Sequence, residues 1–218
     1  MIQLDRIEND PYIVELLKAS DRQIAALGYT EHGIRHATVT CEAARKICSG
    51  LGLSQWETDV ACAASFLHDI GNLTGRENHG PLGATLVSPF LVQHGLLPEE
   101  LARVITAISC HDDDEKPVIS TVTTAVTIIA DKSDVNRSRV RPTADIKTDI
   151  HDRVNYAVLE SNVSASKGKV LLSLRLDPQI ACTADYLEIF ASRMQAMRKS
   201  AQFLGCEYEL EINNVKIF

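Results

Sequence analysis

Histidines and aspartates stand at the ends of several apolar segments of this chain. The apolar stretch "VACAASFL" runs directly into His68 and Asp69, so both polar groups are expected at the edge of a core. An unpaired buried charge is unfavourable, and an aspartate at a helix C-terminus opposes the helix dipole. A bound cation would explain the placement. Further candidates of this kind end or begin other apolar segments, namely His79, His111 and Asp131.

Imidazole nitrogens and carboxylate oxygens are ligands that suit first-row metal ions such as iron, manganese, cobalt, nickel and zinc. Two divalent ions held by four neutral imidazoles and two carboxylates would carry a net charge of about +2, before any bridging hydroxide is counted. Such a site would attract phosphate although the whole chain has a net charge of -7. The residues therefore point to metal chemistry on an anionic substrate.

The composition limits the partners of such a site. A chain of 218 residues with 45% hydrophobic and 23% charged residues can build one core, or one domain with a small appendage. Its acidic charge disfavours long nucleic acid and membrane surfaces as partners. The six cysteines form no CxxC pair, so we expect them to be reduced and buried. Without a leader-like or membrane-spanning stretch, the protein is expected to be cytoplasmic.

The elements that must position the candidate ligands are mostly helical. Apolar residues recur at helical spacing from Asp10 to about Asn136, including the segment "STVTTAVTIIADKSDV", whose β-branched residues would also fit a strand. Ser54 and Glu57 form a capping-box pattern at the start of one helix. The pattern changes after Pro142. We therefore predict a mainly α protein, with a helical domain at 1–142 and a small α+β domain at 143–218.

The predicted second domain has a ββαβ order. "RVNYAVLESNVSA" and "KVLLSLRLD" resemble strands, "ADYLEIFASRMQAMRKSAQFLG" is a long amphipathic helix, and "EYELEINNVKIF" returns to strand-like alternation. Two roles are open for this domain. It can mediate a homodimer, or it can shape the substrate pocket of the helical domain.

The order His36, then His68-Asp69, then Asp131 on successive helices resembles the HD-domain superfamily of metal-dependent phosphohydrolases. The resemblance covers roughly residues 25–140, and its segments are "HDIG", "HGPLGATL", "ISCHD" and "IADKSDV". His36 taken alone would be a structural or surface histidine. The intervening His79 and His111 match the branch of the superfamily that holds two metals.

The resemblance implies a dinuclear site. Asp69 would bridge two divalent ions, with His36, His68 and Asp131 on one ion and His79 and His111 on the other. A water shared by the two ions would lose a proton near neutral pH, and the resulting metal-activated hydroxide would attack phosphorus. The implied function is a phosphohydrolase acting on a nucleotide or another small phosphorylated metabolite.

Cationic side chains near the site are candidates for binding the phosphate and for stabilising negative charge on the leaving oxygen. Arg76 lies in the loop between His68 and His79, and Lys132 directly follows Asp131. The arginines of "NRSRVR" at 137, 139 and 141 are more readily explained as solvated loop charges. Members of the superfamily often have lysine at the position of Asn72, so this chain lacks one expected phosphate contact.

Neighbours of the expected ligands have two possible roles. His32, with Glu31, fits a loop or helix start better than a place beside the metals. The segment "DDDEK" after His111 is expected to be a solvated turn, although its first residue, Asp112, is close enough in sequence to His111 to orient a ligand histidine.

Two other function classes fit the same ligand order. Oxygenases that resemble the myo-inositol oxygenase branch hold two irons with such a set and activate dioxygen. A metal-stabilised regulatory module without catalysis is the third possibility, favoured by Asn72 and by the unassigned second domain. The cations near the site favour the phosphohydrolase.

Overall fold

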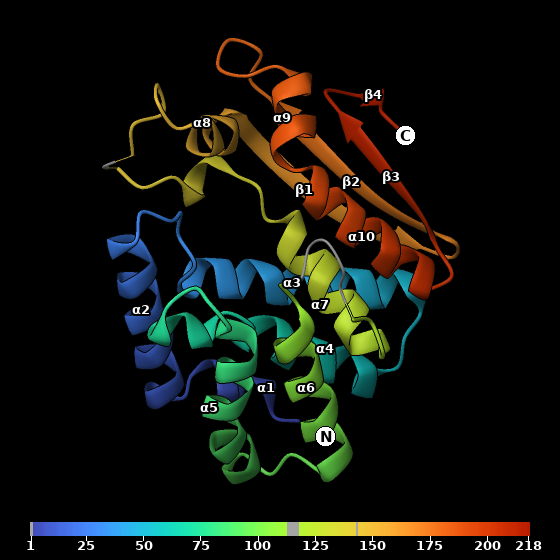
Figure 1. Ribbon diagram of the computed structural model, residues 1–218. Coiled ribbons are helices and arrows are strands. Elements are labelled where there is room, and N and C mark those ends of the chain that lie inside the picture. The colour runs from blue at the N-terminus through green and yellow to red at the C-terminus, as the bar shows by residue number, and fades with distance from the viewer. Residues whose placement is uncertain (1, 113–117, 143) are drawn as a thin grey trace.

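The computed structural model describes residues 2–112, 118–142 and 144–218. Every element described before residue 158 is a helix, and a sheet with two further helices follows (Figure 1). The α-helices are α1 (Leu4–Glu8), α2 (Pro11–Ala26), α3 (Ile34–Leu51), α4 (Gln55–Leu67), α5 (His79–Gln93), α6 (Pro98–Cys110), α7 (Val122–Ser133), α8 (Ile150–Ala157), α9 (Thr183–Ile189) and α10 (Ala191–Phe203). Short 3-10 helices are η1 (Ile70–Thr74) and η2 (Arg137–Arg139). The strands are β1 (Val158–Ser166), β2 (Lys169–Leu176), β3 (Glu207–Ile212) and β4 (Val215–Lys216).

Local sequence sets where the central helices begin. The Ser54 hydroxyl accepts the backbone N–H of Glu57, and the Glu57 carboxylate accepts the backbone N–H of Ser54 at 2.9 Å, which confirms the capping box before α4. The ambiguous segment after Ser120 is helix α7, as predicted. Its residues after Val122 are all buried, so packing on every side outweighs their strand propensity.

Helix α7 holds the helical part together. It packs against α3, α4 and α6, and α5 packs against α6 and η1. These are the helices that carry or adjoin the candidate ligands, so their shared core brings the ends of separate segments to one place. None of the helices within residues 2–112, 118–142 and 144–218 combines the length and the apolar character that a membrane span requires.

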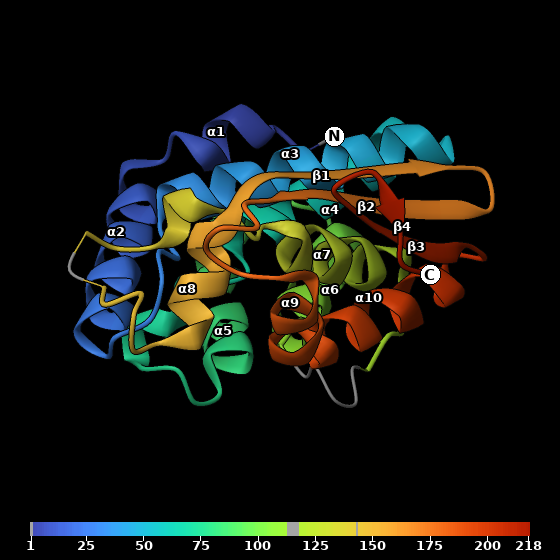
Figure 2. The same ribbon diagram turned by 90° about the horizontal axis from the view of Figure 1, so that it is seen from above.

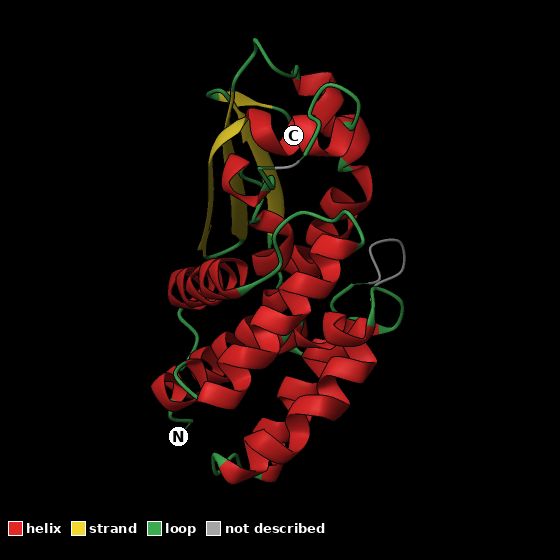
Figure 3. Ribbon diagram, turned by 90° about the vertical axis from the view of Figure 1, so that its left-hand side faces the viewer, coloured by secondary structure: helices red, strands yellow, loops and turns green. Residues whose placement is uncertain are grey.

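The strands form one sheet in the order β1-β2-β3-β4 at one end of the molecule (Figure 3). β2 pairs antiparallel with β1 and parallel with β3, and α9 and α10 make the connection between β2 and β3. Strand β1 packs against α3, while α10 packs against β3 and α7, so the sheet is fixed to the helices (Figure 2). A Cβ at Gly50 of α3 would collide with the carbonyl oxygen of Ala165, so glycine permits this close approach.

The fold class is confirmed as mainly α with a small α+β C-terminal region, but two elements differ from the prediction. The first predicted strand begins as helix α8, whose N-terminus the Asp149 carboxylate caps by accepting the backbone N–H groups of His151 and Asp152. The single long helix is two helices, because the backbone at Phe190 leaves helical geometry. The last segment is a hairpin with Asn213 and Asn214 at positive φ, as a tight β-turn requires.

Two further predictions concern the domain boundary and the burial of the cysteines. The division of the chain at residues 142 and 143 stays a prediction, and the buried apolar core includes residues from both sides of that position. All six cysteines are free thiols, as expected, but only Cys41, Cys48, Cys62 and Cys206 are buried. Cys182 is exposed because it lies at the start of α9, on the surface.

Candidate metal centre

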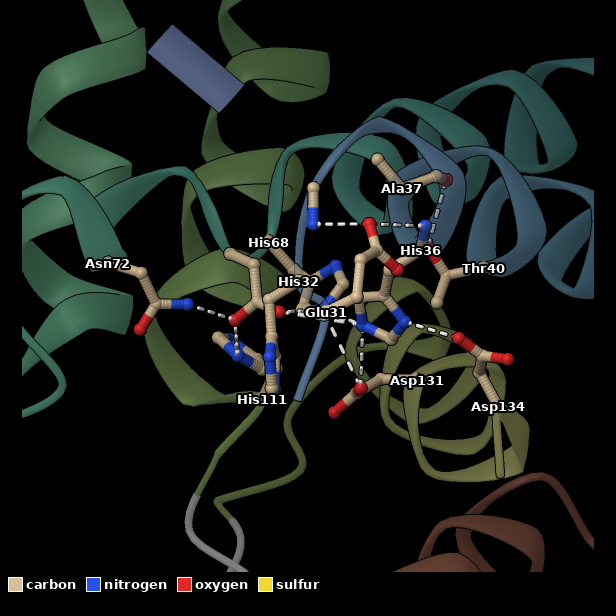
Figure 4. A network of polar contacts seen from close by, with 12 residues as sticks. Glu31, His32, His36, Ala37, Thr40, His68, Asn72, His111, Asp131 and Asp134 are labelled. Carbon is tan, nitrogen blue, oxygen red and sulfur yellow. Dashed lines mark hydrogen bonds and ion pairs between the residues drawn. The ribbon is translucent and has the colours of Figure 1, made fainter. Parts of the chain in front are cut away.

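The six candidate ligands meet in one buried cluster. His36 lies in α3 and Asp131 in α7, while the other four residues lie at or next to helix ends, where short side chains can reach a common point. Each of the six is at most 8% exposed. Figure 4 shows the rings of His36, His68 and His111 and the carboxylate of Asp131 turned toward one another. The six candidate ligands are His36, His68, Asp69, His79, His111 and Asp131.

Backbone carbonyls fix the orientation of three histidine rings. The Nδ1 atoms of His68, His79 and His111 lie 2.7, 2.9 and 2.7 Å from the carbonyl oxygen three residues earlier in each case. A carbonyl oxygen can only accept, so each Nδ1 must carry a proton and donate it. In the neutral ring, Nε2 is then left with a bare lone pair. All three rings therefore offer Nε2 as a metal ligand.

A carboxylate fixes the fourth histidine. His36 donates its Nδ1 proton to Asp134 Oδ2 at 2.6 Å, and the guanidinium of Arg35 donates to the same carboxylate at 2.6 Å. Burial opposes the charged form of Asp134, but the hydrogen bond from His36 and the charge of Arg139 hold the pKa of this carboxyl below its usual range. A carboxylate behind an imidazole is a common support for a metal ligand. Asp134 is not among the residues predicted from the sequence.

The Nε2 atoms converge in two pairs, which we call the first pair (His36 and His68) and the second pair (His79 and His111). The two Nε2 atoms lie 3.1 Å apart in the first pair and 3.0 Å apart in the second. Asp69 lies between the pairs: its Oδ2 is 3.4 and 3.2 Å from the first-pair nitrogens, and its Oδ1 is 3.4 and 3.8 Å from the second-pair nitrogens. One carboxylate thus faces both pairs.

The donor set fits divalent metal ions. Lone pairs that face each other at about 3 Å repel unless a cation or proton lies between them. Asp69 Oδ2 is buried and has no hydrogen-bond partner within the described part of the chain. Three overlapping groups of ligands place their donor atoms within 4.8 Å of one another, and Asp69 belongs to two of these groups. Asp131 completes the first pair, with Oδ1 3.2 Å from His36 Nε2.

The carboxylates of the cluster also favour a bound positive charge, either a proton or a metal ion. Burial opposes protonation of His68, yet the carboxylates of Asp69 and Asp131 raise its pKa to about 10. His111 behaves differently, because burial lowers the pKa of its ring. A metal ion at the first pair would therefore replace a proton, as metal ligation by histidine requires.

The structure places both predicted cations beside the ligands. Arg76 Nη1 lies 3.6 Å from Asp69 Oδ1, and Lys132 Nζ lies 3.0 Å from Asp131 Oδ2. Asp112 binds both cations, since it accepts two hydrogen bonds of 2.8 Å from Arg76 and one of 3.1 Å from Lys132. Asp112 was expected to lie in a solvated turn, with the orientation of a histidine as the alternative. Its main contacts are instead with these two cations.

Asn72 supports the shared carboxylate. Its side chain is fully buried, and Nδ2 donates to Asp69 Oδ1 at 2.7 Å, while Oδ1 faces Arg76 Nη1 at 3.4 Å. The residue that stands in place of a lysine therefore orients Asp69. The amide lies where it can hold the oxygen that faces the second pair.

One sequence-based interpretation is wrong and another is incomplete. His32 lies in the loop directly before α3, as expected, but it is also buried beside the cluster, with its ring edge-on to His36 at a centroid distance of 5.5 Å. Arg139 was expected to be a solvated loop charge, but it is 1% exposed and donates to the backbone carbonyls of Asp134 and Glu31. Both residues reach these places through the packing of η2 against the loop before α3, which the local sequence does not reveal.

A family model and a solved structure are similar to this chain. The family model of the HD domain matches residues 30–157. One similar solved structure is the crystal structure of a "predicted HD superfamily hydrolase" from an uncultured Thermotogales bacterium. It is 23% identical over 57% of this chain and 67% of that chain, with a TM-score of 0.46. Among curated proteins no match is found.

Proposed function

This chain belongs to the HD-domain family, and on that premise we propose that it is a metal-dependent hydrolase of phosphate esters that acts on a nucleotide or another small phosphorylated metabolite. One observation carries the proposal. The two oxygens of Asp69 face two separate pairs of histidine Nε2 atoms, in a cluster whose Nδ1 atoms all donate outward.

The proposed ligands divide between two ions. His36, His68 and Asp131 would hold one ion together with Asp69 Oδ2, and His79 and His111 would hold the other together with Asp69 Oδ1. Divalent ions in such a site lower the pKa of bound water and polarise phosphoryl oxygens. Asn72 and Asp134 keep Asp69 and His36 in place by the hydrogen bonds described above.

Arg76 and Lys132 are the residues that would bind the phosphate. Both carry positive charge within 4 Å of a proposed ligand, and Asp112 holds both side chains in fixed positions. The Arg76 side chain is 29% exposed, so a substrate that enters from solvent can reach it. A guanidinium binds phosphate oxygens through two N–H groups, and it can also stabilise charge on the leaving oxygen.

The test is turnover of a panel of phosphomonoesters and phosphodiesters after reconstitution with manganese, iron, cobalt, nickel or zinc. We expect phosphate release with at least one metal and its loss in Asp69→Ala. The matched control is His94→Ala, because His94 pairs with Asp10 outside the cluster. Absence of turnover with every ester and every metal would contradict the proposal.

The same ligands would also suit two irons and dioxygen chemistry. Arg76 and Lys132 beside the cluster favour a phosphate substrate over an uncharged one. A mixed-valence diiron signal that changes when a substrate is added, without phosphate release, would favour the oxygenase.

A further inference from the structure

A cavity of about 290 Å³ lies between the metal centre and the C-terminal helices. Its walls come from the loop before α3, from the loop before α5, from α8 and from the region where α9 meets α10. Residues from each of these parts line it, among them Tyr29, His32, Arg76, Asn155, Phe190 and Arg193. Chain segments that lie far apart in the sequence thus enclose one space.

Two of the lining residues also touch the metal centre. Arg76 Nη1 is 3.6 Å from Asp69 Oδ1, and the His32 ring lies edge-on to the ring of His36. Arg76 is the residue proposed to bind the phosphate that reacts. A phosphate held there would direct the rest of the substrate into the cavity.

Arg193 is a cation positioned for a second anion. Its Cζ lies 4.8 Å from the centroid of the Phe190 ring, and Phe190 is itself buried. A guanidinium that stacks on a ring keeps its N–H edge available for two parallel hydrogen bonds to phosphate. Within the described ranges, no carboxylate lies within 4 Å of Arg193. Burial lowers the pKa of Arg139, and the charge of Arg193 helps to lower it further, so Arg193 adds positive charge to this side of the molecule.

Asn155 supplies a hydrogen-bond acceptor. The residue is 4% exposed, its Nδ2 donates to the carbonyl oxygen of His151 at 2.9 Å, and its Oδ1 has no partner within the described part of the chain. A buried oxygen of this kind requires a donor. The Asp152 carboxylate, also from α8, adds further acceptors to the lining. Hydroxyl groups are the donors that fit this wall.

We propose that this cavity is the leaving-group subsite of the enzyme, and that it selects a hydroxylated phosphoester carrying a second phosphate. Arg193 binds the second phosphate, and Asn155 Oδ1 accepts a hydroxyl of the leaving group. The C-terminal helices thereby set the substrate specificity of the helical metal centre. This inference rests on the proposed function, since it assumes that the first phosphate reacts at the metals.

The test compares esters that differ only in the second phosphate. Fructose 6-phosphate is paired with fructose 1,6-bisphosphate, and adenosine 5′-phosphate is paired with adenosine 3′,5′-bisphosphate, so that the two pairs separate a sugar from a nucleoside leaving group. We expect a kcat/KM at least about tenfold higher for the bisphosphate in one pair, as a charge-assisted bidentate contact would give. Equal values within both pairs would overturn the inference.

Variants of Arg193 test whether this residue causes the preference for the bisphosphate. Arg193→Ala should raise KM for the preferred bisphosphate about tenfold while kcat stays nearly constant, and Arg193→Lys should retain part of the preference. Arg198→Ala is the matched control, because Arg198 is exposed on the same helix and does not line the cavity. An Arg193→Ala enzyme that keeps the full preference would contradict the assignment.

A binding measurement separates this inference from the proposed function. Calorimetry with the metal-free protein should show weaker binding of the preferred bisphosphate to Arg193→Ala than to the wild type or Arg198→Ala. If no ester is hydrolysed but this difference appears, the proposed function fails and with it the leaving-group role, while Arg193 still binds an anion in the cavity. If esters are hydrolysed but Arg193→Ala binds the bisphosphate as the wild type does, the subsite fails and the function stands.

Discussion

The two histidine pairs of the metal centre are supported in different ways. In the first pair, His36 donates to the Asp134 carboxylate, whose side chain is 3% exposed. In the second pair, both rings donate to backbone carbonyls, and the charged pair Arg76 and Asp112 lies beside them with 29% of each side chain exposed. A carboxylate behind an imidazole makes it a stronger ligand. We therefore expect the first pair to bind its metal ion more tightly, and we expect substrate to approach from the side of the second pair.

Asp69 joins the two pairs, so its loss has the largest expected effect. We expect Asp69→Ala and the near-isosteric Asp69→Asn to reduce the metal content of both pairs and to lower kcat/KM on the order of 10³-fold or more. Elemental analysis and phosphate-release kinetics measure the two effects. His94→Ala should leave both unchanged. An Asp69→Ala protein that still binds two ions would show that Asp69 does not bridge the pairs.

Removing one ligand from the second pair should affect only one ion. We expect His111→Ala to retain the ion at the first pair, to lose the other, and to lose about 100-fold or more in turnover. The measurement is metal content after dialysis against a defined concentration of free manganese. Loss of both ions, or of neither, would mean that the two pairs do not act as separate sites.

The carboxylate support of the first pair is tested by Asp134→Asn. The variant keeps the shape of the side chain but weakens the acceptor for His36, and we expect metal affinity at the first pair to fall about 10–100-fold. Asp112→Asn is the matched variant beside the second pair. It should leave metal affinity at the first pair unchanged and raise KM, because Arg76 and Lys132 lose their shared partner. Equal effects of the two variants on metal affinity would remove the distinction between the pairs.

The pairs should also differ in their response to pH. In the metal-free protein the raised pKa of His68, about 10, keeps its ring protonated at neutral pH, so an ion at the first pair must displace this proton. Affinity there should rise about tenfold per pH unit between about pH 6 and 9. Burial lowers the pKa of His111, so its ring binds a proton less readily than that of His68 and should contribute a smaller slope. Calorimetry on His111→Ala and His36→Ala at several pH values measures each pair separately. Equal slopes would contradict the assignment.

The ligands could be predicted from the sequence because most of them directly follow or precede an apolar helical segment. His68, His79 and His111 end up together since the helices that carry them share one core. Asp134 could not be predicted in this way. Its contact with His36 joins residues 98 positions apart and depends on how α3 and α7 pack. The sequence does place the Asp134 carboxylate three residues after the candidate ligand Asp131, and this spacing could have indicated that Asp134 lies near the metal centre.

The C-terminal region shows where periodicity fails. Polar and apolar residues alternate along α8 in a way that resembles a strand, but the Asp149 side chain caps the N-terminus of this segment and stabilises it as a helix. The break between α9 and α10 at Phe190 contains no proline or glycine from which it could be predicted, yet it places the aromatic ring against the guanidinium of Arg193. The cavity is built from such long-range packing. The residues that α8 and α10 contribute to it could not be predicted, whereas Arg76 and the candidate metal ligands could.

The most direct test of the account is anomalous diffraction from crystals of the protein reconstituted with manganese. We predict two manganese peaks, one bounded by His36, His68 and Asp131 and the other by His79 and His111, with one oxygen of Asp69 on each. A single peak, or two peaks without Asp69 between them, would contradict the central claim that this carboxylate joins two metal sites.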